Sequence, residues 1–104
     1  MGAHCELFKQ KWEFHLDYQR GFTLLEQEYC LSRARPFESL AGRWAAKHAA
    51  SQLGKGAWTD FEIIRSDEGV PFLKPLHPDD QQSVWEMSIT HDHPWAYALV
   101  VLKF

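Results

Sequence analysis

Polar and apolar positions along the chain separate a helical first half from a strand-like second half. The segment 35–54, RPFESLAGRWAAKHAASQLG, has the strongest helical pattern. Pro36 suits the first helical position and Gly54 suits the position after the C-cap. At 100° per residue, one stripe of this helix holds Phe37, Leu40, Ala41, Trp44, His48 and Ser51/Gln52. His48 is therefore expected to point toward protein or a cleft rather than toward open solvent.

A second helix is predicted just before this one, from about 24 to 33. The segment FTLLEQEYCLSR opens with a capping box, in which Thr23 accepts from the N3 amide while Glu26 reaches back. Phe22 is the apolar residue that precedes the cap. The amphipathic segment 9–21 ends in glycine and predicts a helix or an irregular turn, and 4–8 predicts a short strand.

The second half of the chain has the pattern of antiparallel strands. WTDFEIIRSD and GVPFLK flank DEG, which is a hairpin signal. SVWEMSITHD and WAYALVVLKF predict two more strands around HDHP, and the last is apolar enough for a central strand. Helices followed by antiparallel strands indicate an α+β domain, with an N-terminal strand and helices packed on a mainly antiparallel sheet.

Composition narrows the class of protein. A chain of 104 residues with 45% apolar residues and five tryptophans predicts a single packed domain over 1–104. The net charge of −3 argues against a general nucleic-acid binder. Cys5 and Cys30 lack metal-knuckle spacing, which makes a disulfide framework unexpected and suggests a reducing compartment. No run approaches transmembrane length, and the start lacks signal-peptide features. These features predict a cytoplasmic domain without nucleic-acid or membrane partners.

Histidines near acidic groups are the first candidate chemistry. His4 and Glu6 would project from one face of a strand, as would His91 and His93 if their strand continued to 93. Neutral imidazoles with a carboxylate suit zinc, manganese or iron(II) better than magnesium. A capped or otherwise satisfied histidine is the alternative for either pair.

Cations on the long helix are the second candidate chemistry. Arg43 and Lys47 form an i, i+4 row beside the apolar stripe and could hold two phosphoryl groups, with arginine as the bidentate fork. The alternative is a solvated helix face. The sequence has no Gly-rich phosphate loop, nucleophile elbow or Cys/His catalytic pairing.

Four motifs carry a family resemblance. FTLLEQEYC, P-x-x-S-x-AGRWAAK, the LG that follows, and SITHD occur in this order. They resemble the 4′-phosphopantetheinyl transferase family, in its small holo-acyl-carrier-protein synthase branch, and especially the transferase domain of fungal-type fatty acid synthases. The resemblance covers the chain from Gly2 to the last strand. It implies that this chain has the family's α+β fold.

The resemblance also implies a reaction and its partners. A serine of an acyl or peptidyl carrier protein attacks the β-phosphate of coenzyme A, phosphopantetheine is transferred, and 3′,5′-ADP leaves. A divalent cation, usually magnesium, bridges the pyrophosphate and neutralises developing charge, as expected for phosphoryl chemistry. Stand-alone members are typically homotrimers with the active site between protomers.

Residue by residue, the resemblance places the metal positions at sites that differ from the family pattern. GAHCE stands where G-x-D-x-E belongs, so His4 replaces the aspartate and Glu6 keeps the second carboxylate. AAKHA stands where AAKEA belongs, so His48 replaces the helix glutamate. One helical turn later, Gln52 stands where the family has its catalytic lysine.

The retained positions concern coenzyme A. Arg43 and Lys47 are implied phosphate contacts, and His91 in SITHD is an implied coenzyme A contact. The resemblance therefore assigns substituted catalytic positions to His48 and Gln52, and a metal set to His4, Glu6 and His48.

Two interpretations follow from the substitutions. In the first, loss of two anionic oxygen ligands removes the magnesium site, because magnesium requires near-octahedral oxygen coordination. The domain would then bind coenzyme A or a carrier protein, or serve in assembly, without transfer. In the second, His4, Glu6 and His48 form a two-His-one-carboxylate set for zinc, manganese or iron(II). A zinc module unrelated to the transferases is a further alternative.

Overall fold

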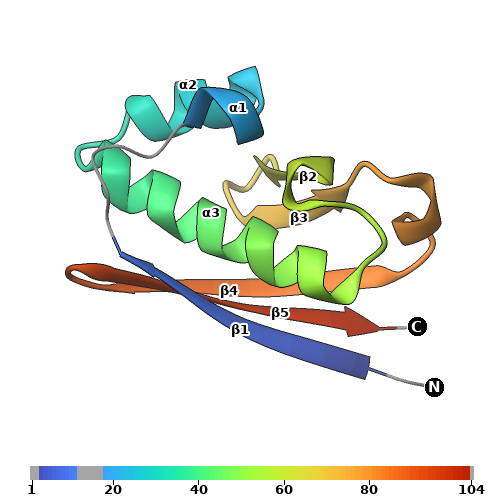
Figure 1. Cartoon of the computed structure of the whole chain (residues 1–104). Helices are drawn as coiled ribbons and strands as arrows, with labels where there is room; N and C mark the ends of the chain where they lie inside the picture. The colour runs from blue at the N-terminus through green and yellow to red at the C-terminus, as the bar shows by residue number, and fades with distance from the viewer. Residues whose placement is uncertain (1–2, 12–17, 104) are drawn as a thin grey trace.

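One long helix forms the middle layer of the fold. The computed structural model describes residues 3–11 and 18–103. Helix α3 (Pro36–Leu53) lies across one face of a three-stranded antiparallel sheet in the order β1 (Ala3–Lys11), β5 (Trp95–Lys103), β4 (Val84–Asp92) (Figure 1). The opposite side of α3 is covered by smaller elements: α1 (Tyr18–Gly21), α2 (Leu24–Leu31) and the β2 (Phe61–Arg65)–β3 (Pro71–Pro75) pair. The predicted α+β class is confirmed.

Helix α2 begins as its capping box predicts. The Thr23 Oγ1 accepts from the Glu26 amide at 3.3 Å, and the Glu26 Oε1 accepts from the Thr23 amide at 2.9 Å. The helix ends at Leu31, slightly earlier than predicted. The prediction of a helix or an irregular turn over 9–21 was wrong for residues 9–11, which continue β1 to Lys11, and is confirmed at the other end by the short helix α1. Residues 12–17 lie outside the described part.

Helix α3 matches its prediction closely. Pro36 occupies the first turn, and Gly54 is the C-cap itself rather than the residue after it, with its amide donating to the Ala50 carbonyl at 2.9 Å. The burial extends well beyond the predicted stripe, because a middle-layer helix is packed on two sides. Its alanines allow close approach to the sheet and the hairpin, in a core of Ala45, Ala46, Ala49, Ala50, Phe61, Ile63, Leu73, Ala98 and Val100.

The strand predictions are confirmed. Strand β5 is central, and alternate residues from Ala96 to Leu102 are buried toward α3. The predicted DEG turn joins β2 to β3, with Gly69 at φ +83°, where glycine has no steric penalty. Strand β4 ends at Asp92, so the condition for pairing His91 with His93 on one strand face is not met.

Both cysteines lie in the described part of the chain. Cys5 is exposed, Cys30 is buried, and both are free cysteines. Among the helices of the described chain, none combines the length and apolar character that crossing a membrane requires.

Two short 3-10 helices complete the fold. η1 (Trp58–Asp60) leads into β2, and η2 (Pro78–Asp80) precedes β4. Asp80 is buried, and its carboxylate accepts from the Lys55 amide at 2.8 and 3.0 Å and from the Gly56 amide at 3.0 Å. This carboxylate therefore ties the turn after α3 to the segment before β4, and in doing so fixes the start of η1.

Candidate functional site

A cavity of about 440 Å³ opens beside the first turns of α3. The end of α2, the turn 32–35 and the end of β4 form its walls. Its lining consists of Tyr29, Arg33, Ala34, Arg35, Glu38, Ser39 and His91. A second cavity of about 200 Å³ shares Tyr29, Ser39 and His91 and adds Arg43, Pro71 and Ile89. The volume of the larger cavity is in the range of small-molecule sites.

A glycine on α3 lets β4 come close enough to form this cavity. A Cβ atom built on Gly42 would lie 2.8 Å from the His91 Nε2 and 2.8 Å from the Ile89 Cγ2. Any larger residue would have to displace the strand or the imidazole. Gly42, the glycine of AGRW, therefore positions His91 against the helix.

Two arginines and an imidazole supply hydrogen-bond donors around the larger cavity. Arg33, Arg35 and His91 line it together with one carboxylate, Glu38. Glu38 bridges two of them: its Oε2 lies 3.6 Å from the Arg35 Nη1, and its Oε1 lies 3.6 Å from the His91 Nδ1. Two exposed guanidinium groups and an imidazole suit an anionic ligand such as a phosphate. The structure thus places His91 in a cavity, as its predicted ligand role requires.

Tyr29 forms the wall shared by both cavities, and three arginines gather on its ring. The guanidinium carbons of Arg33, Arg43 and Arg65 lie 5.3, 4.4 and 4.8 Å from the ring centroid. Such cation–π contacts orient guanidinium groups without neutralising them. The motif FTLLEQEYC contained Tyr29, but no periodicity in the sequence indicated that it would collect arginines.

Arg43 is largely buried, with 6% of its surface exposed. Its Nη1 donates to the Ile63 carbonyl at 3.0 Å, which ties α3 to β2. The guanidinium still lines the smaller cavity. The predicted phosphate contact by Arg43 stays a prediction, while its anchoring role is clear from the structure.

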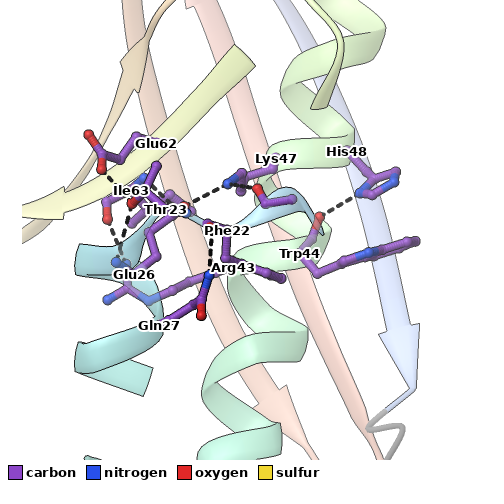
Figure 2. A network of polar contacts seen from close by, with 11 residues as sticks. Phe22, Thr23, Glu26, Gln27, Arg43, Trp44, Lys47, His48, Glu62 and Ile63 are labelled. Atoms are coloured by element: carbon purple, nitrogen blue, oxygen red, sulfur yellow. Dashed lines mark hydrogen bonds and ion pairs between the residues drawn. The ribbon is translucent and has the colours of Figure 1, made fainter. Parts of the chain in front are cut away.

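The structure corrects the prediction for Lys47. Its side chain is fully buried, and the Nζ donates to the Gly21 carbonyl at 2.6 Å and to the Glu26 Oε1 at 2.7 Å (Figure 2). Burial lowers the pKa of Lys47, although the Glu26 carboxylate opposes that shift. Neither the predicted phosphate contact nor the solvated face holds, because the ammonium lies in the core and is bound to protein atoms.

Glu26 is the centre of this buried network. Its Oε1 accepts from Thr23 and Lys47, and its Oε2 accepts from the Ile63 amide at 2.9 Å. One carboxylate therefore links α2, α3 and β2 (Figure 2). The capping-box pattern identified the local bond of Glu26, but its partners 21 and 37 residues away depend on tertiary packing.

His48 lies in an aromatic stack on the next position of the same helix. Its ring centroid is 3.5 Å from that of Trp44 and 4.6 Å from that of Trp58, with interplanar angles of 25° and 24°. The His48 Nδ1 is 2.9 Å from the Trp44 carbonyl oxygen, and since a carbonyl only accepts, Nδ1 carries the hydrogen. Burial lowers the pKa of His48, and the charge of Lys47 adds to that shift. The expectation that His48 points toward protein is confirmed.

The other substituted positions lie on two elements that pack together. His4 and Glu6 face α3, since their cross-strand partners Leu102 and Val100 are buried on that side of the sheet. Gln52 is exposed in the last turn of α3. Within residues 3–11 and 18–103, no three His, Cys, Asp or Glu side chains gather in a group that could hold a metal ion. The structure therefore does not assemble His4, Glu6 and His48 into the hypothesised set.

Trp58 is the residue of this region that sequence reasoning missed. The sequence pattern predicts a strand that includes Trp58, whereas the structure places it in η1 against Phe22, Trp44 and His48. Trp58 lies outside α3 in the sequence, so no helical or strand periodicity could have predicted its contact with that helix.

Comparison with known proteins gives a consistent result, although no family model matches the chain. The holo-acyl-carrier-protein synthase of Chloroherpeton thalassium is 37% identical over 93 residues, covering 82% of this chain and 77% of that protein. The protein of the same name from Moorella thermoacetica is 40% identical over 96 residues, covering 81% and 74%.

Solved structures show the same fold. The holo-acyl-carrier-protein synthase of Bacillus anthracis in complex with CoA (3′,5′-ADP) superposes with a TM-score of 0.78 at 28% identity, over 95% of this chain and 94% of that one. The Helicobacter pylori protein in complex with coenzyme A gives a TM-score of 0.79 at 22% identity, over 96% and 100%. The second likeness concerns the fold alone.

Proposed function

Because the chain belongs to the holo-acyl-carrier-protein synthase family, we propose that it binds coenzyme A and directs phosphopantetheinyl transfer to an acyl carrier protein. The observation that carries this proposal is the cavity lined by Arg33, Arg35 and His91. Coenzyme A carries a pyrophosphate and a 3′-phosphate at its nucleotide end, and cationic side chains around an open cavity suit such a group.

The geometry supports binding of the nucleotide end in this cavity. Arg35 is well exposed and forms a surface ion pair with Glu38, so its guanidinium can turn to a phosphate at little cost. Gly42 keeps His91 against α3, in the cavity that Arg33 also lines. The Bacillus anthracis relative, whose structure contains CoA (3′,5′-ADP), supports the same class of ligand.

The proposed reaction balances without an additional reactant. The serine oxygen of the carrier protein bonds to the β-phosphorus of coenzyme A, and the bond from that phosphorus to the bridging oxygen breaks. The electron pair leaves with 3′,5′-ADP, and the serine proton passes to solvent or to a base. In this chain, cationic side chains at the cavity stabilise the departing charge.

Magnesium does not fit the residues that the resemblance assigns to it. Magnesium prefers oxygen ligands in octahedral geometry, whereas His4 and His48 offer imidazole nitrogens and only Glu6 offers a carboxylate. His48 is also held within the Trp44–Trp58 stack. No step of the proposed reaction is therefore assigned to a metal ion in this chain.

Two measurements test the proposal. Isothermal titration with coenzyme A and with 3′,5′-ADP should show saturable binding, and His91→Ala should weaken both by about tenfold, the loss of one charge-assisted contact. Incubation with coenzyme A and an apo carrier protein should add phosphopantetheine to the carrier, seen by intact mass. Absence of binding for both nucleotides would overturn the proposal.

A second candidate is a domain that binds coenzyme A and a carrier protein without transfer. It is favoured by the three substituted positions, His4, His48 and Gln52. The same experiment separates the candidates, because saturable coenzyme A binding without a mass change on the carrier identifies the binding domain. Recovery of transfer in His4→Asp/His48→Glu/Gln52→Lys would show that only the chemistry had been lost.

We propose that the chain assembles as a homotrimer through the outer face of the three-stranded sheet. None of the described elements covers this face (Figure 1), and it exposes large apolar side chains: Leu7 (64%), Val84 (57%) and Leu99 (40%). Light scattering coupled to size exclusion should give three times the chain mass, and Leu7→Glu/Leu99→Glu should reduce it. A monomer for the unmodified chain would contradict the proposal.

A further inference from the structure

We infer that the His48 region of α3 has become a structural aromatic stack, so that this chain uses no divalent cation at His4, Glu6 and His48. The inference rests on the proposed function only in using coenzyme A as a probe. It starts from the mismatch between magnesium, which prefers oxygen ligands, and the side chains of His4, Glu6 and His48, which offer two imidazoles and one carboxylate.

The stack is held in place from both sides. Trp44 lies one turn before His48 on α3. Trp58 comes from η1, and its indole lies directly on Gly21, where a Cβ atom would be 1.6 Å from the Trp58 Cη2. Trp58 also contacts Phe22 edge-on, at 6.0 Å between ring centroids. Trp44 and Trp58 both pack against the smaller core cluster of Phe22, Cys30 and Leu40, and His48 lies against these two rings.

The chemistry of the stack favours an imidazole at position 48 and disfavours a carboxylate. An aromatic face carries partial negative charge, which attracts electropositive ring edges and cations and repels anions. A flat, neutral imidazole stacks against the Trp44 indole at a centroid distance of 3.5 Å and against the Trp58 indole at 4.6 Å. A glutamate at this position would bring its negative charge against these negative faces. His48, Trp44 and Trp58 thus form a mutually compatible set.

The hydrogen bond of His48 does not by itself make a metal site. Donation from Nδ1 to a backbone carbonyl also occurs in metal-binding histidines, where it orients the ring. A zinc site needs at least three protein ligands, and in the described part of the chain no such group forms. The bond instead holds the imidazole plane within about 25° of the planes of the two neighbouring indoles.

Stability measurements test the structural half of the inference. His48→Phe keeps a stacking ring, and we expect its urea unfolding midpoint to equal or exceed that of the unmodified chain. His48→Glu introduces the carboxylate, and we expect a clear fall of the midpoint at pH 7. Gln52→Glu is the matched control, since it adds the same charge one turn later at an exposed position. Equal midpoints for His48→Glu and Gln52→Glu would overturn the structural role.

Metal titrations test the other half on the intact chain. Titration with Mn²⁺ followed by electron paramagnetic resonance, and with Zn²⁺ by calorimetry, should show no stoichiometric site that His48→Phe removes. Coenzyme A affinity should change by less than about twofold between Mg²⁺ and EDTA. One Mn²⁺ or Zn²⁺ per chain that is lost in His48→Phe, or an affinity raised about tenfold by Mg²⁺, would overturn the inference.

The test remains decisive if the proposed function fails. Should coenzyme A bind in neither condition, the proposed function would be rejected, while the direct metal titrations and the unfolding midpoints would still decide the inference. If His48→Glu does not fold at all, His48→Gln serves in its place, and a midpoint equal to that of the unmodified chain would overturn the role of the ring stack.

Discussion

The two halves of α3 carry similar polar side chains, but those of the first half line cavities and those of the second are enclosed by other parts of the protein. Near its start, Ser39 and Arg43 line cavities beside the exposed Arg35 and His91. One to two turns later, Lys47 is fully buried against Glu26, and His48 is stacked against two indoles. The sequence predicted ligand roles in both halves, but the two cavities that contain predicted ligands lie beside the first half.

The difference comes from what packs on each half. The turn 32–35 and the end of β4 leave space beside the first turns of α3, whereas α2, η1 and β2 cover the later ones. A cation beside open space keeps most of its hydration and is available to a ligand. A cation that loses its water must be paired, and Lys47 is paired with Glu26. Packing, rather than residue type, therefore decides which of these charges can bind a ligand.

The largest expected effect comes from breaking the buried pair. Lys47→Met leaves the Glu26 carboxylate buried without its cation, and removal of one partner of such a pair costs about 3–5 kcal/mol. We expect this loss in the free energy of urea unfolding. The effect on coenzyme A affinity should be small in the fraction that remains folded.

A surface pair provides the matched control. Lys103 lies 2.8 Å from Glu86, with their side chains 49% and 57% exposed. Lys103→Met should change the free energy of unfolding by less than about 1 kcal/mol. If Lys47→Met and Lys103→Met had equal effects, the distinction between the two halves of α3 would lose its energetic basis.

The cavity beside the first half of α3 is tested by replacing the exposed arginines that line it. Arg33→Ala/Arg35→Ala should lower the affinity for 3′,5′-ADP by about a hundredfold or more, since it removes two charge-assisted contacts that contribute about 1.5–3 kcal/mol each. The unfolding midpoint should stay close to that of the unmodified chain, because both side chains are exposed. Calorimetric titration and urea unfolding on the same preparations measure the two quantities. Unchanged affinity would remove the cavity as the nucleotide site.

A glycine at the cavity wall links stability to binding. Gly42→Ala places a methyl group 2.8 Å from the His91 Nε2 and the Ile89 Cγ2, so β4 or the imidazole must shift. Overpacking costs about 1–3 kcal/mol, against a gain of about 1 kcal/mol from replacing glycine in a helix. We expect a net loss of stability together with weaker nucleotide binding. A more stable variant with full affinity would show that His91 need not lie against α3.

The smallest expected effect is a pH dependence of stability that arises from His48, in the second half of α3. Burial lowers the folded-state pKa of His48 below its ordinary value of 6.5, so below pH 6.5 the unfolded chain binds more protons at this residue than the folded chain does. Stability is therefore lost as the pH falls from 6.5 toward the folded-state pKa and is constant with respect to His48 below it. The difference in unfolding free energy between the unmodified chain and His48→Phe should change in this window. A difference independent of pH would contradict the shift.

Much of the fold was predictable because its signals are local. The capping box at Thr23 and Glu26, the turn at Gly69 and the apolar last strand each involve residues close in sequence. The start of the segment 9–21 and the start of WTDFEIIRSD differ from their predictions, since the first continues a strand and the second is the 3-10 helix η1. The amphipathic pattern of 9–21 suggested a helix or an irregular turn, but pairing with β5 extends β1 to Lys11, and such pairing across the whole chain has no local signature.

The candidate site was predictable only in part. His91 was identified from its motif, and the structure places it in a cavity. Tyr29 and Trp58 were not identified, because their roles depend on arginines and rings brought together from separate elements. Lys47 was assigned wrongly, since a helical position beside the apolar stripe does not reveal a carboxylate 21 residues earlier in the chain.

The sequence by itself determined the local elements, the family motifs and the substitutions at His4, His48 and Gln52, because these depend on residue identity and spacing alone. Only the tertiary structure decided which polar side chains are available. Burial removes water from Lys47 and His48 and obliges them to bond within the protein, while the same fold leaves Arg35 and His91 beside open space. The physical reason is that desolvation depends on all neighbours of a group in space, and those neighbours come from every part of the chain.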